Sequence, residues 1–162
     1  MYLAFDNDLY NKKPGNIFLP GNLYKQVQVA YAVPRNISLV SVKQNNLFNL
    51  FPTDLHGQID EGFYMFSLRR GGRAAQQVET LKKILVSEVH AEFYKTAYLL
   101  GKNHMQELKA KNQFLFGNEV SQALQLPLPQ FATYYRELEL LDSLVHEIHR
   151  IFLFKILKSG SV

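Results

Sequence analysis

The fold of this chain is decided by two stretches, Asn-Leu-Phe-Pro-Thr-Asp-Leu-His-Gly at residues 49–57 and Ser-Leu-Arg-Arg-Gly-Gly-Arg-Ala at residues 67–74. Between them lies the apolar run Gly-Phe-Tyr-Met-Phe at residues 62–66, which is typical of a strand in the interior of a sheet. Both polar stretches should therefore flank one strand and place hydrogen-bonding and cationic groups at adjacent strand ends. That layout suits a ligand that carries a phosphate and is partly aromatic.

Outward from these stretches, short apolar or alternating segments predict a chain rich in strands. The predicted strands are 24–33, 37–42, 63–68, 84–89, 133–141 and 145–157. The first two are expected to pair as a hairpin across residues 34–36, and residues 43–46 form a polar turn after the second. Asp142 and Ser143 separate the last two strands.

Two helices are predicted between these strands. Residues 74–83 contain strong helix formers, and the spacing of Ala74, Val78 and Leu81 gives the segment one buried stripe. Residues 92–100 form the second helix, with Gly101 as its C-terminal cap. Residues 106–129 carry conflicting signals, and the prolines at 127 and 129 exclude pairing in the centre of a sheet. The expected fold class is β-rich (α+β), a small antiparallel β-barrel with inserted helices.

Size and composition favour one folded domain over residues 1–162. The chain has 162 residues, of which 47% are hydrophobic, so it can bury one sizeable core. Its aromatic residues are 12 Phe and 9 Tyr, which favour strands because they pack well on a pleated surface. Residues 1–23 are rich in Asn, Gly and Pro and are expected to form an N-terminal arm.

The charge and the cysteine content of the chain exclude or disfavour several classes of protein function. The net charge is +4, but the basic residues are scattered in short groups, so nucleic-acid binding is disfavoured. The absence of cysteine excludes disulfides, thiolate metal sites and cysteine nucleophiles. We see no secretory signal and no apolar stretch of about 18 residues, the length needed to span a membrane, so we expect a cytoplasmic protein without a membrane partner.

Sequence motifs for metal binding or side-chain catalysis are also missing. His146 and His149 do not have the His-Glu-x-x-His spacing, and on one strand they would face opposite sides, so no metal site is predicted. There is no Gly-x-Ser-x-Gly elbow, no Gly-x-Gly-x-x-Gly fingerprint and no Gly-Lys-Ser/Thr phosphate loop. We therefore predict no catalytic side chain.

Residues 40–54 together with residues 67–74 resemble the flavin reductase-like, FMN-binding split-barrel family. In that family the second strand of a hairpin ends in an Asn-x-x-Pro-like loop, and a later strand leads to a basic residue that opens a helix. Asn49 to Pro52 and Arg73 occupy the matching places here, and the resemblance covers about residues 24–158. It implies a split barrel that binds FMN, usually at the interface of a homodimer. It also implies that a nicotinamide nucleotide or another reductant supplies electrons.

A flavin phosphate needs hydrogen-bond donors and at least one cation, because burying a dianion without them is costly. Arg69 and Arg73 are the best candidates, and Gly71 and Gly72 before the helix would let backbone N–H groups approach the same anion. The alternative is that these arginines belong to a solvated turn. Asp54 departs from the family pattern, in which a small hydroxyl residue is common, and would repel a phosphate. Either Thr53 supplies the hydroxyl instead or the cofactor is held differently.

The remaining candidates concern the ring, the ribityl chain or a nicotinamide substrate. Asn49 and Thr53 could meet the flavin, although a tight Asn-Pro loop explains them equally well. His104 and Lys102 follow a helix end and could contact a phosphate or simply interact with the helix dipole. The complete predicted cofactor-binding set is Ser41, Lys43, Asn49, Pro52, Thr53, Asp54, His56, Ser67, Arg69, Arg73, Ala74, Lys102 and His104.

The function that follows from the resemblance is that of an FMN-binding oxidoreductase of the flavin reductase type. The flavin would carry out the hydride chemistry, while the protein supplies binding and orientation. The alternative is a noncatalytic module that uses the same scaffold to bind a flavin or another anionic ligand.

Overall fold

The computed structural model describes residues 9, 12, 14, 32 and 35–162. The chain divides into two compact units, residues 1–36 and residues 37–162, and the second unit is described throughout. The predicted arm at 1–23 and the predicted strand at 24–33 lie outside the described residues except at isolated positions, and so does the hairpin expected between 24–33 and 37–42.

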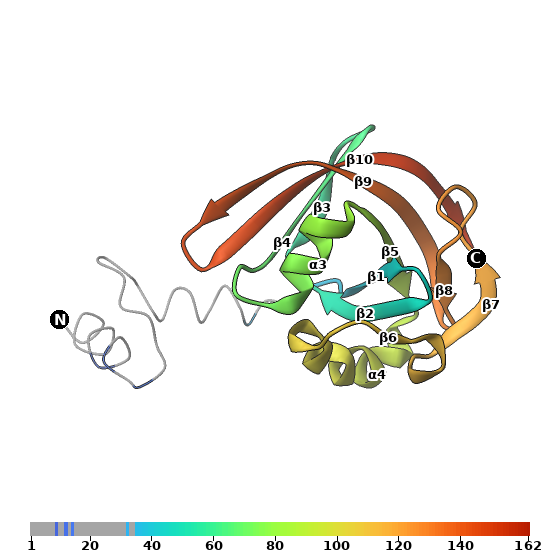
Figure 1. Ribbon diagram of the computed structural model, residues 1–162, viewed down its shortest axis with the longest axis horizontal. Helices are drawn as coiled ribbons and strands as arrows, with labels where there is room; N and C mark the ends of the chain where they lie inside the picture. Colours follow the sequence, from blue (N-terminus) through green and yellow to red (C-terminus); the bar gives the residue numbers. More distant parts are fainter. Residues whose placement is uncertain (1–8, 10–11, 13, 15–31, 33–34) are drawn as a thin grey trace. The chain divides into compact units, whose positions relative to one another are not determined.

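Most of the second unit is an eight-stranded antiparallel sheet with the strand order β3-β4-β10-β9-β5-β1-β2-β6 (Figure 1). A separate two-stranded sheet pairs β7 with β8. The strands are β1 Ser38–Gln44, β2 Leu47–Thr53, β3 His56–Asp60, β4 Phe63–Arg69, β5 Lys83–Val89, β6 Lys109–Ala110, β7 Phe116–Val120, β8 Pro127–Pro129, β9 Ala132–His146 and β10 His149–Ser161. The helices are α3 Arg73–Leu81, η1 Ala91–Phe93, α4 Tyr94–Leu99, η2 Leu100–Met105 and η3 Lys111–Gln113.

The main core lies between α3 and the concave face of the curved sheet, where β9 and β10 arch over the helix (Figure 1). Alternate residues of β4 are buried there, and Phe66 stacks against Phe154 of β10 with ring centroids 4.9 Å apart. The helix contributes Val78, which is fully buried as its spacing predicted. Each large side chain buried in this way stabilises the fold by about 1.5–3 kcal/mol.

The predicted elements 37–42, 63–68, 74–83 and 84–89 are confirmed as β1, β4, α3 and β5. The helix α3 ends at Leu81 with Lys82 in a left-handed conformation (φ 61°), and β5 begins at the next residue. The β-rich, antiparallel fold class with inserted helices is confirmed as well.

The loop expected from residue 49 onward is wrong, because residues 47–53 form β2 and pair with β1 across the turn at Asn45 and Asn46. Leu50 and Phe51 are both fully buried, on opposite faces of the strand, and this two-sided burial overrides the turn preference of Asn49 and Pro52. The neighbouring strand β6 pairs only with the first two residues of β2, so Pro52 lies beyond that pairing, where a strand tolerates proline.

The turn expected at Asp142 and Ser143 is also wrong. Both residues belong to β9, and the chain reverses at Glu147 and Ile148 instead, with Glu147 at φ 52°. His146 and His149 then face each other across this hairpin as register partners, on the same face of the sheet. The expectation that they face opposite sides fails because they lie on two strands rather than one.

The segment predicted as one helix at 92–100 is divided into η1, α4 and η2, and Gly101 lies inside η2 rather than capping α4. Ala97 is buried in a second core cluster against Leu39 and Leu50, on the other face of β1 and β2. None of the helices in the described part of the chain is long and apolar enough to cross a membrane. The cytoplasmic location stays a prediction.

Beyond η2, the structure settles a region that the sequence left open. Residues 127–129 form β8, which pairs only with β7, so the prolines lie outside the main sheet as predicted. The loop before β8 is held by Glu137 of β9, a fully buried carboxylate that accepts hydrogen bonds from the backbone N–H groups of Ala123 and Leu124. Charge-assisted bonds of this kind compensate for the burial of the carboxylate.

Candidate functional site

Three segments far apart in sequence meet at a buried amide network: β2, α3 and η2. The Asn49 Nδ2 atom donates to the Gln77 Oε1 atom at 2.8 Å and to the Asn103 carbonyl at 3.0 Å. Asn103 in turn donates to the Leu50 carbonyl at 2.7 Å, and Gln77 donates to the Gln106 carbonyl at 2.8 Å. Because these amides are largely saturated by protein partners, the network fixes the geometry of the site rather than offering free groups to a ligand.

Next to this network, His104 lies against the end of β2. Its Nε2 atom donates to the Pro52 carbonyl at 2.7 Å, and its ring packs on Phe51 with centroids 5.0 Å apart. Burial lowers the pKa of His104 below its usual value of 6.5, although the Pro52 hydrogen bond and the nearby Asp54 carboxylate act in the opposite direction. A neutral imidazole with Nε2–H as donor leaves Nδ1 as an acceptor.

The N-terminus of α3 lies beside His104. Gly72 is its N-cap residue, with no side-chain cap and no acidic residue in the first turn. A Cβ atom on Gly72 would lie 3.2 Å from the Arg69 carbonyl and 3.3 Å from the His104 carbonyl, so glycine permits this close approach. The first backbone N–H groups of a helix lack intrahelical partners and carry partial positive charge, which suits an anion.

Arg73, the first residue of α3, has its guanidinium group engaged by two side chains. Its Nη1 atom donates to the Gln76 Oε1 atom at 3.1 Å, and its Nε atom lies 2.9 Å from the Glu107 Oε1 atom. The side chains of Arg73 and Glu107 are 53% and 71% exposed, so this ion pair is worth only about 0–1 kcal/mol. The Arg73 guanidinium can therefore exchange Glu107 for another anion at small cost.

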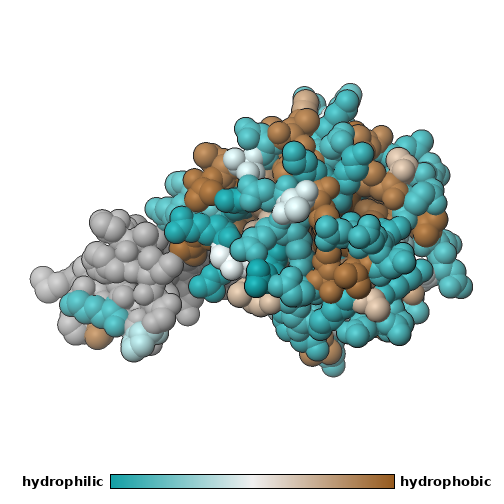
Figure 2. Space-filling view, viewed as in Figure 1, coloured by the Kyte–Doolittle hydropathy of each residue, from teal (hydrophilic) through white to brown (hydrophobic). Residues whose placement is uncertain are grey.

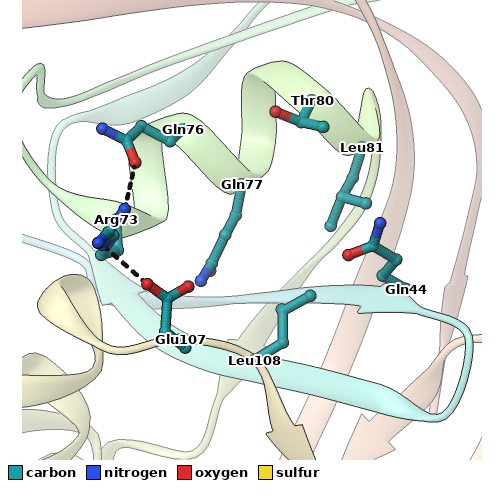
Figure 3. Close-up of a pocket in the computed structure, with 8 residues that line it drawn as sticks. All are labelled: Gln44, Arg73, Gln76, Gln77, Thr80, Leu81, Glu107 and Leu108. Carbon is teal, nitrogen blue, oxygen red and sulfur yellow. Dashed lines mark hydrogen bonds and ion pairs between the residues drawn. The ribbon is translucent and has the colours of Figure 1, made fainter.

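A cleft of about 160 Å³ opens between α3 and the chain that leads into β6 (Figure 3). Arg73, Gln76 and Glu107 lie at one end of it, and Thr80, Leu81 and Gln44 lie at the other. The full lining is Gln44, Arg73, Gln76, Gln77, Thr80, Leu81, Glu107 and Leu108.

The structure thus brings Asn49, Pro52, Asp54, His104 and Arg73 of the predicted set around β2, η2 and the start of α3. Asn49 and Pro52 do so from within β2, not from a loop. Thr53 ends the same strand but is buried opposite Ser38.

Other predicted residues do not join this group. Ser41 lies on the opposite face of β1, fully buried, and its hydroxyl has no hydrogen-bond partner in the described part of the chain. Ala74 is buried in the main core. The Ser67 hydroxyl lies 3.0 Å from the Nδ1 atom of His149, the first residue of β10. Ser67 therefore contacts the strand that pairs with β4, and not β2.

The other predicted cations are solvent-exposed, as Arg73 is, but they lie apart from this group. Arg69 ends β4 opposite His149, and Lys102 lies in η2. Lys43 is exposed near the end of β1, where its Nζ atom lies 5.7 Å from the centre of the Phe48 ring.

His56 belongs to a different polar cluster. Its Nδ1 atom lies 2.6 Å from the Tyr64 hydroxyl. The pKa of Tyr64 is raised to about 12, mainly by burial, with a smaller lowering by the Arg136 charge and a smaller raising by the Glu88 charge included in that value. Arg136 pairs with Glu88 at 2.7 Å and lies 4.6 Å from the centre of the Tyr134 ring. Sequence reasoning missed this cluster because its members lie on β3, β4, β5 and β9.

Sequence reasoning also missed Gln77, Asn103 and Glu107. No local pattern marks them, because their partners lie 28 to 54 residues away or on another element. Because Gln77 follows Arg73 by four residues in α3, helix geometry predicts that the two are neighbours. Only the fold brings Asn49 next to Gln77.

Comparison with known proteins adds the fold relationship. No family model and no curated protein matches the chain. Among solved structures, an FMN-binding protein from Thermus thermophilus with bound p-hydroxybenzaldehyde is 16% identical, with a TM-score of 0.70 over 82% of this chain and 74% of that one. A Streptomyces globisporus NADH:FAD oxidoreductase is 14% identical, with a TM-score of 0.72 over 93% of this chain and 89% of that one.

The styrene monooxygenase flavin reductase from Pseudomonas putida S12 is 17% identical, with a TM-score of 0.68 over 83% of this chain and 84% of that one. Identities this low show the fold alone. That fold is the one shared by the flavin reductases and FMN-binding proteins, and it confirms the architecture that the resemblance implied.

Proposed function

We propose that this chain, which has the fold of the flavin reductase-like split barrels, binds a flavin and acts as an oxidoreductase through it. The observation that carries the proposal is the uncapped N-terminus of α3, with Arg73 in its first turn, beside His104 and the end of β2. This arrangement fits the phosphate of a flavin, because that group needs several donors and a cation.

We assign the phosphate contacts to Arg73 and to the first backbone N–H groups of α3. The Arg73 guanidinium would exchange the exposed Glu107 carboxylate for the phosphate. Asn49 acts as a positioning residue, since both hydrogens of its amide are already donated to Gln77 and Asn103. His104 holds β2 through the Pro52 carbonyl and stays neutral near pH 7.

We further propose FMN as the flavin, with electrons supplied by a nicotinamide nucleotide or another reductant. A bound FMN would supply hydride and electron transfer, chemistry that requires no protein nucleophile. The proposal of FMN rests on the sequence resemblance of residues 40–54 and 67–74. Among the neighbours in fold, one is named as FMN-binding and another as an NADH:FAD oxidoreductase.

We also propose a homodimer. Phe63 and Met65 on β4 and Leu144 on β9 expose 42%, 41% and 65% of their surface, and the strand register places Met65 and Leu144 on the same outer face. On the side drawn in Figure 2, hydrophobic side chains form several separate patches among hydrophilic ones. Covering an exposed apolar face with a second copy removes that surface from water. Light scattering during size-exclusion chromatography would give the mass, and a monomeric mass contradicts this proposal.

The test of function is a titration of the purified chain with FMN, followed by NADH or NADPH without oxygen. We expect saturable quenching of flavin fluorescence and then bleaching of the flavin absorbance by one of the two nucleotides. Failure to bind FMN or FAD would contradict the proposal as a whole. Binding without bleaching by either nucleotide, while dithionite still reduces the flavin, would favour the noncatalytic binding module instead.

A further inference from the structure

The cleft beside α3 has the size of a single-ring molecule. Its volume of about 160 Å³ is close to that of protein cavities of about 150 Å³ that admit benzene. Figure 3 shows Leu81 and Leu108 pointing into the cleft from opposite sides, which provides apolar contact for a ring. The cleft is too small for a whole flavin, so its occupant is a different molecule or a small part of one.

Several polar groups around the cleft have unused hydrogen-bonding capacity. Within residues 35–162, the side chains of Gln44 and Thr80 form no hydrogen bond, and Gln76 uses only its carbonyl oxygen, to accept from Arg73. Gln77 differs, because both ends of its amide are bonded to protein groups. Polar groups that converge on a concave, partly apolar site are the usual mark of a small-molecule site.

The charges of the cleft restrict the ligand further. Arg73 offers N–H donors and Glu107 offers an acidic acceptor, and the two lie 2.9 Å apart at the same end. A carboxylate ligand would meet Arg73 but be repelled by Glu107, and an ammonium ligand would meet the reverse problem. A primary carboxamide satisfies both, because its carbonyl accepts from a guanidinium and its NH₂ group donates to a carboxylate.

We propose that this cleft binds a neutral single-ring molecule that carries a primary carboxamide. The carboxamide oxygen accepts a hydrogen bond from Arg73, and its NH₂ group donates to Glu107. The ring lies between Leu81 and Leu108, with Gln44 and Thr80 available to a second polar substituent. The ligand proposed for this cleft differs from the proposed flavin, although Arg73 would contact both.

The test is an NMR titration of the flavin-free, ¹⁵N-labelled chain with benzamide, benzoate and benzylamine, three probes with the same ring. We expect benzamide to shift the side-chain amide signals of Gln44 and Gln76 in a saturable way. Benzoate and benzylamine should bind about 1.5- to fivefold more weakly, because each places a like charge opposite one of the two exposed charged partners. Equal or tighter binding of benzoate, or no saturable shift with benzamide, overturns the inference.

The variant Glu107→Gln separates this reading from nonspecific binding. It removes the negative charge that repels a carboxylate, so we expect the ratio of benzamide to benzoate affinity to fall by about 1.5- to fivefold. The control Glu119→Gln neutralises an exposed carboxylate on β7 and should leave the ratio unchanged. An unchanged ratio in Glu107→Gln, with an unchanged NMR spectrum of the fold, overturns the inference. Because the titration contains no flavin, its failure would not touch the proposed flavin function, and failure to bind FMN would not touch the cleft.

Discussion

Gly72 and His104 lie in such close contact that a side chain on Gly72 would press on the His104 backbone. A Cβ atom there would lie 3.3 Å from the His104 carbonyl and 3.2 Å from the Arg69 carbonyl. Both neighbours are backbone atoms, which do not move as easily as the end of a side chain. The contact joins the N-terminus of α3 to η2, and through His104 it reaches Pro52 on β2.

Replacing Gly72 with Ala should therefore destabilise the fold by about 1–3 kcal/mol, the usual cost of overpacking. The free energy of unfolding from urea denaturation measures this cost. Gly71→Ala is the matched control, because a Cβ atom at Gly71 meets nothing within 4 Å. Equal stability of the two variants would mean that η2 shifts freely away from α3.

Arg73→Ala should weaken FMN binding by roughly ten- to a hundredfold. The variant removes one charge-assisted contact, worth about 1.5–3 kcal/mol when the partner is a phosphate. Fluorescence quenching of FMN gives the dissociation constant. Lys158→Ala removes the same charge from an exposed position on β10 and should leave the constant unchanged. Unaltered affinity in Arg73→Ala would disprove the proposed phosphate contact.

Glu107→Gln should strengthen FMN binding. The variant removes the carboxylate that now occupies Arg73 and repels a phosphate, so we expect a gain of about 1.5- to fivefold, equivalent to an exposed ion pair of about 0.2–1 kcal/mol. The gain should shrink in concentrated salt, because screening already weakens the pair. A loss of FMN affinity would show that Glu107 supports the site instead of competing for it.

Asn103→Ala should cost about 1–3 kcal/mol of stability, because it leaves the buried Leu50 carbonyl without its donor. Urea denaturation followed by circular dichroism measures the change. Asn118→Ala, at an exposed position on β7, is the control and should change stability by less than about 0.5 kcal/mol. If both variants are equally stable, the Asn103 hydrogen bond contributes nothing that water cannot replace.

The sequence predicted the elements whose periodicity is local. The apolar run at 63–68 and the helical spacing of Ala74 and Val78 needed no tertiary information, and they became β4 and α3. Asn49 was predicted to lie in a loop because Asn and Pro close together in sequence normally indicate a turn. It lies within β2 because Leu50 and Phe51 are buried on opposite faces of that strand, and Gln77 and Asn103, 28 and 54 residues away, accept the hydrogens of its buried amide.

In the candidate site, too, some residues were predictable from local sequence patterns and others were not. Arg73 was predictable because it follows two glycines and opens a helix, a local pattern. Its partner Glu107 lies 34 positions further on, in a segment without a clear periodicity, and only the fold brings the two together. The relative position of His146 and His149 was also not predictable from local sequence. The position of the β9–β10 turn decides whether these two histidines lie on the same face of the sheet or on opposite faces.

The stability of the fold should depend on pH through His104. Burial lowers the pKa of His104 in the folded state below its unfolded value of 6.5, so the unfolded chain takes up the proton first as the pH falls. The contribution of neutral His104 is thus complete above about pH 6.5, and it is lost as the pH falls through the folded-state pKa. Urea denaturation at intervals between pH 7.5 and pH 5 should show this decline, and His104→Gln should flatten it. His146→Gln, at an exposed position, should keep the wild-type slope. An identical slope in His104→Gln would mean that another group carries the pH dependence.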